Sequence, residues 1–197
     1  MEGPCYAAEF GQYGGRKIGI FGGSFDPVHE GHIHLANLAR AAVGLDEVWF
    51  LPCQISPHKT GTPPTAGETR VQWLELALAD IPWANIETLE LRIDGPSYSW
   101  RTLQMLEEEH PGNEWFWIMG GDQWSNLENW SRPEILTALA SFIVLARNGT
   151  EITERPGFRL HSVEGEHPAS STEIRRALAA GETDIPFLDP AVAAVIR

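Results

Sequence analysis

The stretch KIGIFGGSFDPVHEGH, residues 17–32, decides how the fold begins. Apart from Lys17, its first five residues are apolar or small, which favours a buried strand, and the pair Gly22 and Gly23 follows closely. The apolar residues that come next repeat at the spacing of a helix: Ile33, Ala36 and Ala39. A strand, a glycine-rich turn and a helix in this order are typical of the first unit of a parallel α/β sheet.

Four further segments are predicted to be strands, because they are short runs that contain β-branched or aromatic residues, and most of them are apolar nearly throughout. They are Glu47–Leu51, Asn85–Leu91, Glu114–Met119 and Ser141–Ala146. Between them, apolar residues recur at helical spacing in two places: Val71, Leu74 and Leu78, then Trp100, Leu103 and Leu106. The sequence therefore predicts an α/β fold, a Rossmann-like open parallel sheet with helices on both faces.

Length and charge narrow the class of protein. With 197 residues we expect a single domain over 16–197 after a flexible N-terminal tail, 1–15. The 14 basic and 27 acidic residues give a net charge of −13, which argues against a surface that coats nucleic acid or membranes. Two cysteines and the absence of a long apolar run favour a cytoplasmic protein. A homo-oligomer stays an open alternative.

Two segments outside the strands have their own signals. Residues 55–67 are rich in Pro, Gly and Thr, which predicts an irregular loop and a candidate lid directly after the second strand. Near the end of the chain, Ser170 stands three residues before Glu173, and Gly181 follows an Ala-rich stretch. This spacing predicts a helix with a capping box at its start and a glycine at its end.

The glycine-rich turn lies where parallel sheets bind their ligands, at the carboxyl end of a strand and the start of a helix. Its glycines match neither the dinucleotide fingerprint nor the Walker loop. A metal cluster of His29, His32 and His34 is a second interpretation, but the first two are three residues apart, not four as on a zinc-protease helix. Two imidazoles beside this turn fit phosphate better, because both can donate hydrogen bonds to it.

Two motifs connect the chain to a family. GGSFDPVHEGH resembles the G-x-F-x-P-x-H-x-G-H signature of nucleotidyltransferases that are related to class I aminoacyl-tRNA synthetases, and SSTEIR resembles their second signature, I-S-S-T-x-I-R. The sequence between them is most similar to the bacterial nicotinate mononucleotide adenylyltransferase family, through PHK, RVQWLELAL, SYSWRTL, GGDQWSNLENW and FIVLARNG. The resemblance runs from about Lys17 to the end, with Ala169 and Ser99 as departures from the family pattern.

The resemblance implies a reaction in which nicotinate mononucleotide and ATP give deamido-NAD and pyrophosphate. The 5′-phosphate of the mononucleotide would attack the α-phosphorus of ATP. Because a phosphate monoester is mostly dianionic at pH 7, no side chain needs to act as a general base. Positioning and charge stabilisation then suffice, with Mg²⁺ carried by the phosphates of ATP rather than by a metal site of the protein.

The resemblance also assigns site residues. His29 and His32 are the expected catalytic donors to the phosphates. ATP is expected to contact Gly22, Gly23, Ser24, Phe25, Lys59, Gly120, Asp122, Ser171, Thr172 and Arg175, with Gly121 beside them. For the nicotinate ring the expected residues are Tyr98, Ser99 and Trp130, with Trp124 as the competing aromatic residue.

Three other functions stay open from the sequence. Nicotinamide mononucleotide could replace the nicotinate compound, since acid and amide differ by a few hydrogen bonds that a sequence does not show. A sister enzyme is a second alternative, either an adenylyltransferase with phosphopantetheine as its acceptor or a cytidylyltransferase. A nucleotide-binding regulator without turnover is the alternative from another class, which the intact His29, His32 and Arg175 argue against.

Overall fold

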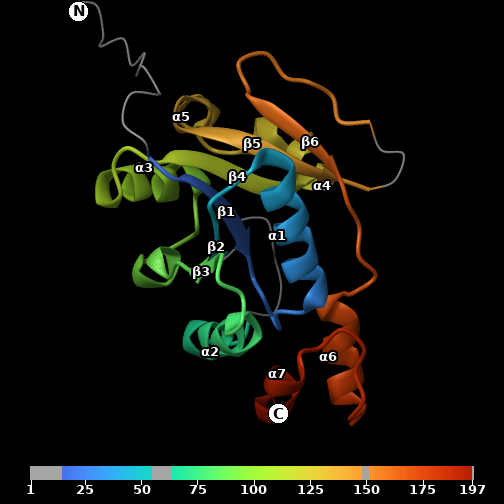
Figure 1. The fold of residues 1–197 in the computed structure, drawn as a ribbon. Helices are drawn as coiled ribbons and strands as arrows, with labels where there is room; N and C mark the ends of the chain where they lie inside the picture. Colours follow the sequence, from blue (N-terminus) through green and yellow to red (C-terminus); the bar gives the residue numbers. More distant parts are fainter. Residues whose placement is uncertain (1–14, 55–63, 148–150, 197) are drawn as a thin grey trace, which may run out of the picture.

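The computed structural model describes residues 15–54, 64–147 and 151–196, which form one sheet with helices packed on it (Figure 1). The strands are β1 (Lys17–Gly23), β2 (Glu47–Pro52), β3 (Ala84–Ile86), β4 (Glu114–Gly120), β5 (Ala140–Ala146) and β6 (Leu160–Glu164). The helices are α1 (Glu30–Val43), α2 (Gly67–Leu78), α3 (Ser99–Glu109), α4 (Gly121–Ser125), α5 (Pro133–Leu139), α6 (Ser171–Ala179) and α7 (Pro190–Val195). Two 3₁₀ turns, η1 (Leu89–Arg92) and η2 (Leu127–Asn129), complete the described elements.

The six strands are all parallel and follow the order β3-β2-β1-β4-β5-β6. Ile18 of β1 is in register with Glu47 of β2 on one side and with Trp115 of β4 on the other. This is the Rossmann order, and the connection reverses its direction between β1 and β4. The predicted fold class is confirmed, and the rule for such sheets places a ligand at the carboxyl ends of these two strands.

Alternating residues of the strands build two separate cores. Val48 and Phe50 of β2 pack on the face covered by α1, α2, α6 and α7, while Trp49 and Leu51 pack on the face covered by α3, α4 and α5. Because successive side chains of a strand point to opposite faces, a strand that is buried on both sides has to be apolar throughout. This is why the inner strands could be recognised from continuous apolar runs.

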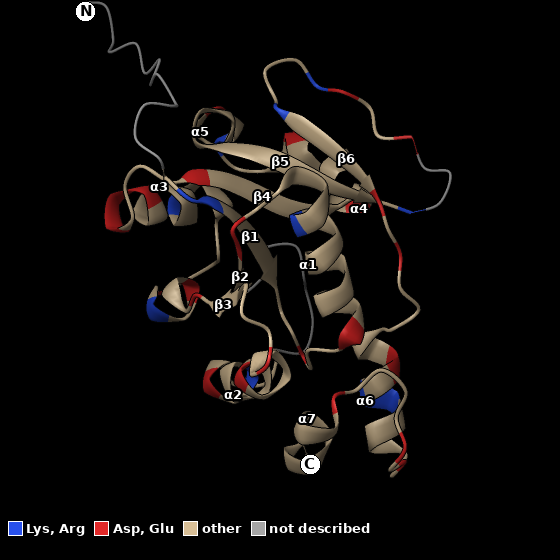
Figure 2. Cartoon of the chain, viewed as in Figure 1, with Lys and Arg blue, Asp and Glu red and all other residues tan. Residues whose placement is uncertain are grey.

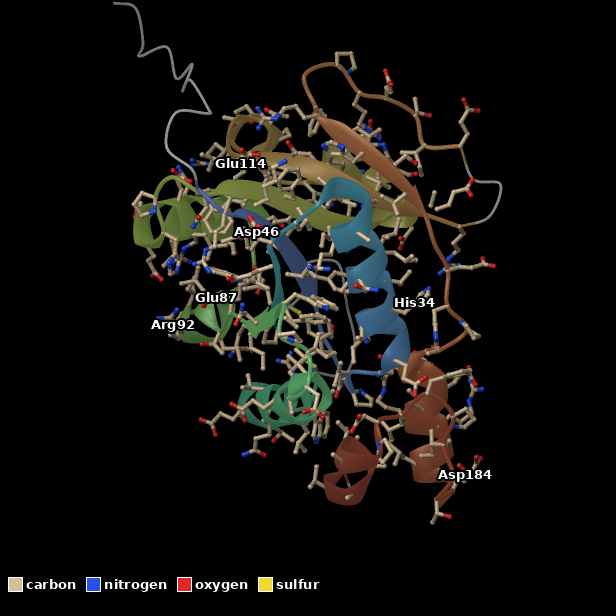
Figure 3. The ribbon with its side chains drawn as sticks, viewed as in Figure 1. His34, Asp46, Glu87, Arg92, Glu114 and Asp184 are labelled. Carbon is tan, nitrogen blue, oxygen red and sulfur yellow. The ribbon has the colours of Figure 1, made fainter. Side chains whose placement is uncertain are left out.

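The strand predicted over Asn85–Leu91 is wrong in its second half. Only Ala84–Ile86 pair with β2, and Leu89–Arg92 form η1. The backbone N–H of Leu89 donates to Glu87 Oε1 at 2.7 Å, and Glu87 also pairs with Arg92 at 3.2 Å (Figure 3). These local polar contacts turn the chain away from the sheet, and they override the apolar alternation of the sequence.

The sequence analysis did not predict β6, and it predicted a capping box at the start of α6 that the structure does not contain. β6 is an edge strand with the sequence LHSVE, so that three of its five residues are exposed and the apolar signal is lost. Helix α6 begins as predicted after Ser170 and is followed by Gly181 at φ 78°, but Ser170 makes no side-chain cap. Instead of closing a capping box, Glu173 pairs with Arg176 at 2.6 Å. The capping-box prediction is therefore wrong.

Two expectations lie largely outside the described residues. The tail 1–15 is described only at Gly15, and residues 55–63, which include Lys59, are not described. The predicted loop reaches its end at Gly67, where α2 starts. In the described ranges, no helix is long and apolar enough to cross a membrane.

Candidate active site

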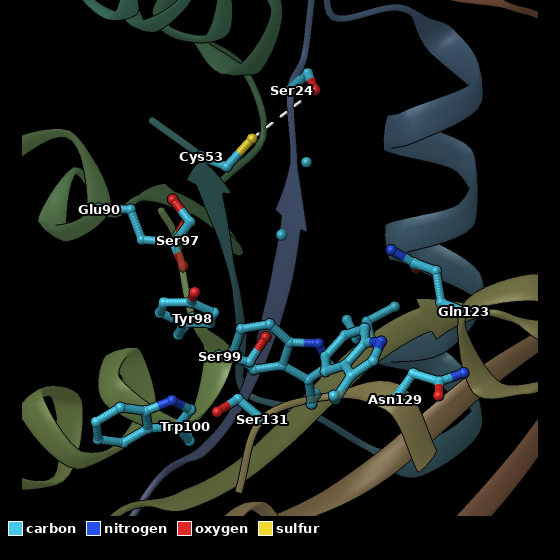
Figure 4. A pocket seen from close by; sticks show the side chains of 15 residues that line it. Ser24, Cys53, Glu90, Ser97, Tyr98, Ser99, Trp100, Gln123, Asn129 and Ser131 are labelled. Atoms are coloured by element: carbon cyan, nitrogen blue, oxygen red, sulfur yellow. Dashed lines mark hydrogen bonds between the residues drawn. The ribbon is translucent and has the colours of Figure 1, made fainter. Parts of the chain in front are cut away.

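Two clefts lie at the switch point between β1 and β4. The first cleft, of about 570 Å³, is lined by Gly22 and Gly23 of β1, by the segment 97–100 before and within α3, and by Trp130 (Figure 4). The second cleft, of about 930 Å³, is lined by Gly120–Asp122 at the end of β4 and by His167–Ser170 before α6. The end of β1 borders both clefts, with Gly22 and Gly23 at the first and Phe21 at the second. We call residues 22–29 the β1–α1 turn.

The two histidines of the β1–α1 turn and α1 stack on each other. The ring centroids of His29 and His32 are 3.7 Å apart, and the backbone N–H of His29 donates to His32 Nδ1 at 3.2 Å. An Nδ1 that accepts a hydrogen bond leaves the proton of a neutral imidazole on Nε2. His32 therefore offers an Nε2–H donor. Phe25, buried in the core, supports its ring edge to face at 5.0 Å.

His29 is kept neutral by its surroundings. The side chain is 7% exposed, and among the described residues its Nδ1 has no hydrogen-bond partner. Burial, and in second place the neighbouring His167, lowers the pKa of His29 from 6.5 to about 4. A neutral imidazole can still donate one hydrogen bond to phosphate. His167 was not singled out in the sequence.

Glycine at position 31 fits a tight space between two imidazole rings. A Cβ atom on Gly31 would lie 3.0 Å from Nδ1 of His29 and 3.0 Å from Nδ1 of His167. A side chain here requires the neighbouring rings to shift by a few tenths of an ångström. The glycine between the histidines of the motif therefore serves packing.

The second signature packs directly on the first. Ser171 Oγ donates to the carbonyl oxygen of Pro27 at 3.0 Å, and Arg175 Nη1 donates to that of Asp26. Thr172 Oγ1 lies 3.4 Å from Arg175 Nη2. The structure thus brings together two motifs that are more than 140 residues apart in the sequence. Figure 2 shows basic residues on α6, although the chain as a whole is acidic.

A buried arginine holds the other side of the β1–α1 turn. Arg70 of α2 is 1% exposed and donates to three carbonyl oxygens: Thr65 at 2.7 Å, Ser24 at 2.7 Å and Cys53 at 2.9 Å. Burial lowers the pKa of Arg70, and Cys53 and Asp26 oppose that shift. The sequence analysis missed this residue. The sequence did hold one signal for it. Arg70 stands three, four and seven residues before the buried Trp73, Leu74 and Ala77, so helical spacing places it on the same buried stripe of α2.

The first cleft contains three of the four residues predicted for the nicotinate ring. Tyr98, Ser99 and Trp130 line it, and Trp130 meets Trp117 edge to face at 6.5 Å. Ser99 is the first residue of α3, so its backbone N–H is one of the donors at a helix start. Trp124, the competing aromatic residue, lines neither cleft. It is 2% exposed in the core, where it donates to the carbonyl oxygen of Thr153 at 2.9 Å.

A buried carboxyl group stands behind this segment of the first cleft. Glu90 is 5% exposed and accepts a hydrogen bond from Thr102 Oγ1 at 2.7 Å. Burial raises the pKa of Glu90, and hydrogen bonds from Thr102 and Ser97 counteract the rise. Ser97 Oγ in turn accepts from the backbone N–H of Gln54 at 3.1 Å. Glu90 therefore fixes the start of α3 beside the end of β2, which the sequence did not indicate.

The remaining predicted residues are placed as follows. Gly120, Gly121 and Asp122 line the second cleft, and Ser24 lines the first. The side chain of Phe25 lies in the core and lines neither cleft, so only its backbone is left as the expected contact with ATP. In the described ranges, no three His, Cys, Asp or Glu side chains gather in a way that could hold a metal ion, and His34 is exposed.

Comparisons with known proteins place the chain in a family. The cytidylyltransferase-like family model matches residues 20–177. A probable nicotinate-nucleotide adenylyltransferase of Geobacillus thermodenitrificans is 41% identical over 181 residues, 88% of this chain and 80% of that protein. The nicotinate-nucleotide adenylyltransferase of Bacillus subtilis is 40% identical over 160 residues, 81% of this chain and 84% of that protein.

A solved structure with low sequence identity shares the fold. The Plasmodium falciparum nicotinic acid mononucleotide adenylyltransferase complexed with NaAD superposes with a TM-score of 0.66 at 20% identity, over 83% of this chain and 84% of that one. Matched over most of its length by both the family model and its curated relatives, the chain belongs to the cytidylyltransferase-like nucleotidyltransferases, in the nicotinate-nucleotide adenylyltransferase family.

Proposed function

We propose that the protein transfers AMP from ATP to nicotinate mononucleotide, giving deamido-NAD and pyrophosphate. One observation carries this proposal: the β1–α1 turn, with His29 and His32, is joined by Ser171 and Arg175 between two clefts at the switch point of the sheet. Each cleft can take one nucleotide, and the phosphates of both would then meet at the turn. The names of the curated relatives support the same reaction.

The reaction requires stabilisation of the negative charge that builds up on the phosphoryl oxygens. The acceptor phosphate is mostly dianionic at pH 7 and attacks the α-phosphorus in line, with pyrophosphate as the leaving group. The Nε2–H of His32 is the donor expected to reach the phosphoryl oxygens on which charge accumulates. His29, with a pKa of about 4, acts as a neutral donor and cannot transfer a proton as an imidazolium at pH 7.

The start of α6 suits the β- and γ-phosphates. Ser171 and Thr172 offer backbone N–H donors at the first turn of a nine-residue helix, and Thr172 adds its hydroxyl. Arg175 adds Nη2 one turn further, since its Nη1 donates to Asp26 and Ser171 Oγ donates to Pro27. Lys59 is a further expected contact outside the described residues. Mg²⁺ accompanies ATP in this proposal, with phosphate oxygens and water as its ligands.

The acceptor and the adenosine would occupy different clefts. In the first cleft, Trp130 offers a face for the pyridine ring, and the start of α3 offers backbone donors near Tyr98 and Ser99 to the nicotinate carboxylate. In the second cleft, the backbone at Gly120 is the expected contact of adenine and Asp122 that of a ribose hydroxyl. We also propose a cytoplasmic location, because ATP and phosphorylated nucleotides do not cross membranes freely.

Pyrophosphate release tests the proposal. The purified protein is mixed with ATP and Mg²⁺, and release is compared with nicotinate mononucleotide, nicotinamide mononucleotide and phosphopantetheine as acceptors. The proposal predicts a strong preference for nicotinate mononucleotide. Preference for another acceptor would overturn the assignment of the first cleft, and no release with any of the three would favour a binding protein.

A further inference from the structure

Three carbonyl oxygens of the β1–α1 turn are held by side chains of α2 and α6. Ser24 O accepts from Arg70 of α2, Asp26 O accepts from Arg175 of α6, and Pro27 O accepts from Ser171 of α6. Carbonyl oxygens that faced a polyphosphate would repel it. A turn whose carbonyls are occupied elsewhere is therefore prepared for an anion.

Arg70 differs from the other two donors because it lies inside the protein. Its guanidinium ties the turn to the end of β2 at Cys53 and to Thr65 near the start of α2. Thr65 also donates its backbone N–H to Asp26 Oδ2 at 3.4 Å. In the described part of the chain, no carboxylate pairs with Arg70 within 4 Å. All three of its acceptors are neutral carbonyls, which is a costly arrangement for a buried charge.

The contact with Ser24 sets the direction of one peptide group. In a trans peptide the N–H points opposite to the C=O, so the N–H of Phe25 points away from Arg70. Phe25 has φ 49°, a conformation that a bulky residue adopts only when its surroundings impose it. Within the described ranges, the backbone N–H groups of Phe25 and Asp26 have no hydrogen-bond acceptor. Two donors at one turn are left for a ligand.

We propose that Arg70 is a positioning residue for adenylyl transfer: by holding the Ser24 carbonyl, it aims the N–H of Phe25 at the phosphates of ATP without touching ATP itself. The inference rests on the proposed function. Packing alone does not explain the buried charge, because an apolar side chain would fit beside Trp73 and Leu74 on the buried stripe of α2. A positioning role does explain it.

Two substitutions separate this role from simple packing. Arg70→Met fills similar volume but removes the charge and all three hydrogen bonds. Arg70→Lys keeps the charge but cannot hold three carbonyls at the angles of a planar guanidinium. Trp115→Phe is the matched control, since it removes a partly buried hydrogen bond, from Nε1 to Glu107 Oε2 at 2.7 Å, at the amino end of β4.

The experiment measures the melting temperature, the kcat and KM of pyrophosphate release, and the affinity for ATP by calorimetry without an acceptor. We expect Arg70→Met to lower kcat roughly 30-fold or more and to weaken ATP binding, with Arg70→Lys in between but at least about tenfold below wild type. Trp115→Phe should lower the melting temperature while kcat stays near the wild-type value.

The outcomes that count against the proposal are distinct. If both Arg70 variants keep kcat and ATP affinity within threefold of wild type, Arg70 is a packing residue only. If Arg70→Lys keeps the wild-type kcat and ATP affinity while Arg70→Met loses both, the positive charge suffices and the orientation of the peptide group plays no part. Should Arg70→Met not fold, Arg70→Lys carries the test. A wild-type protein that releases no pyrophosphate refutes the proposed function instead, and ATP affinity still decides the role of Arg70.

Discussion

The β1–α1 turn and the first cleft meet at Gly22 and Gly23, yet they are built in different ways. The turn is a continuous stretch of sequence fixed from several sides by Arg70, Ser171 and Arg175, with His29 buried. The first cleft is walled by segments that are far apart in the chain, and Tyr98 on its wall is 39% exposed. The difference suggests that the rigid turn serves the chemistry and that the more open cleft chooses the acceptor.

The strongest way to break this comparison is to remove the donor that α1 places beside the turn. His32→Ala should lower kcat by roughly 10²-fold or more, which is the usual effect of losing one donor to developing charge, or about 3 kcal/mol. Folding should change little, because the ring is only partly buried. Pyrophosphate release and a melting curve measure both effects.

His34→Ala is the control for that substitution, two residues further along α1 and exposed. It should keep nearly full activity. A metal site formed by His29, His32 and His34 predicts equal losses for the two variants, and a His32→Ala protein with more than a third of wild-type turnover would contradict the role given to the turn.

The corresponding test of the first cleft is Trp130→Ala. Loss of the aromatic face should raise KM for nicotinate mononucleotide roughly tenfold, or about 1.4 kcal/mol, while kcat falls much less. Trp130→Phe keeps an aromatic face and should restore most of the affinity. An unchanged KM in the alanine variant would place the pyridine ring elsewhere.

The buried state of His29 makes a prediction about stability. Its pKa is about 4 in the folded protein and 6.5 when exposed, so below pH 6.5 only the unfolded chain takes up the proton. Stability is therefore lost as the pH falls from 6.5 towards 4, by about 1.4 kcal/mol at pH 5.5. Urea unfolding at pH 7.5 and 5.5 should show this extra loss in the wild type but not in His29→Gln. Equal losses in both would mean that His29 is not buried as described.

The smallest expected effect on kcat comes from a substitution that shifts the histidine rings slightly. Gly31→Ala introduces a Cβ 3.0 Å from Nδ1 of His29, which requires shifts of a few tenths of an ångström. We expect a fall in kcat of roughly three- to tenfold with an unchanged KM for the acceptor. A matched substitution at an unrestricted helical residue, Asn37→Ala, should leave kcat as it is. An increase in KM alone would show that the turn and the cleft are not separable.

The same contrast explains what the sequence could predict. The inner strands and the β1–α1 turn were recognisable because burial on both faces and a contiguous motif leave local patterns. Edge strand β6 and the turn η1 were not, since exposed residues and the contacts of Glu87 replace those patterns. Arg70, Glu90 and His167 act through tertiary contacts to carbonyls, hydroxyls and rings, and Trp124 differs from Trp130 only in where the chain places it.

The most direct test of the central claim compares His32→Asn with Ser99→Pro, using nicotinate and nicotinamide mononucleotide as acceptors. Proline fits the first position of α3 but removes the N–H proposed for the nicotinate carboxylate, and Ser99→Ala is the control that keeps this N–H. We predict that His32→Asn lowers kcat/KM for both acceptors by the same factor. Ser99→Pro should selectively lower the value for the nicotinate compound, because hydrogen bonds to a charged group are stronger. The account is contradicted if the His32 variant changes the preference between acceptors while Ser99→Pro leaves it unchanged.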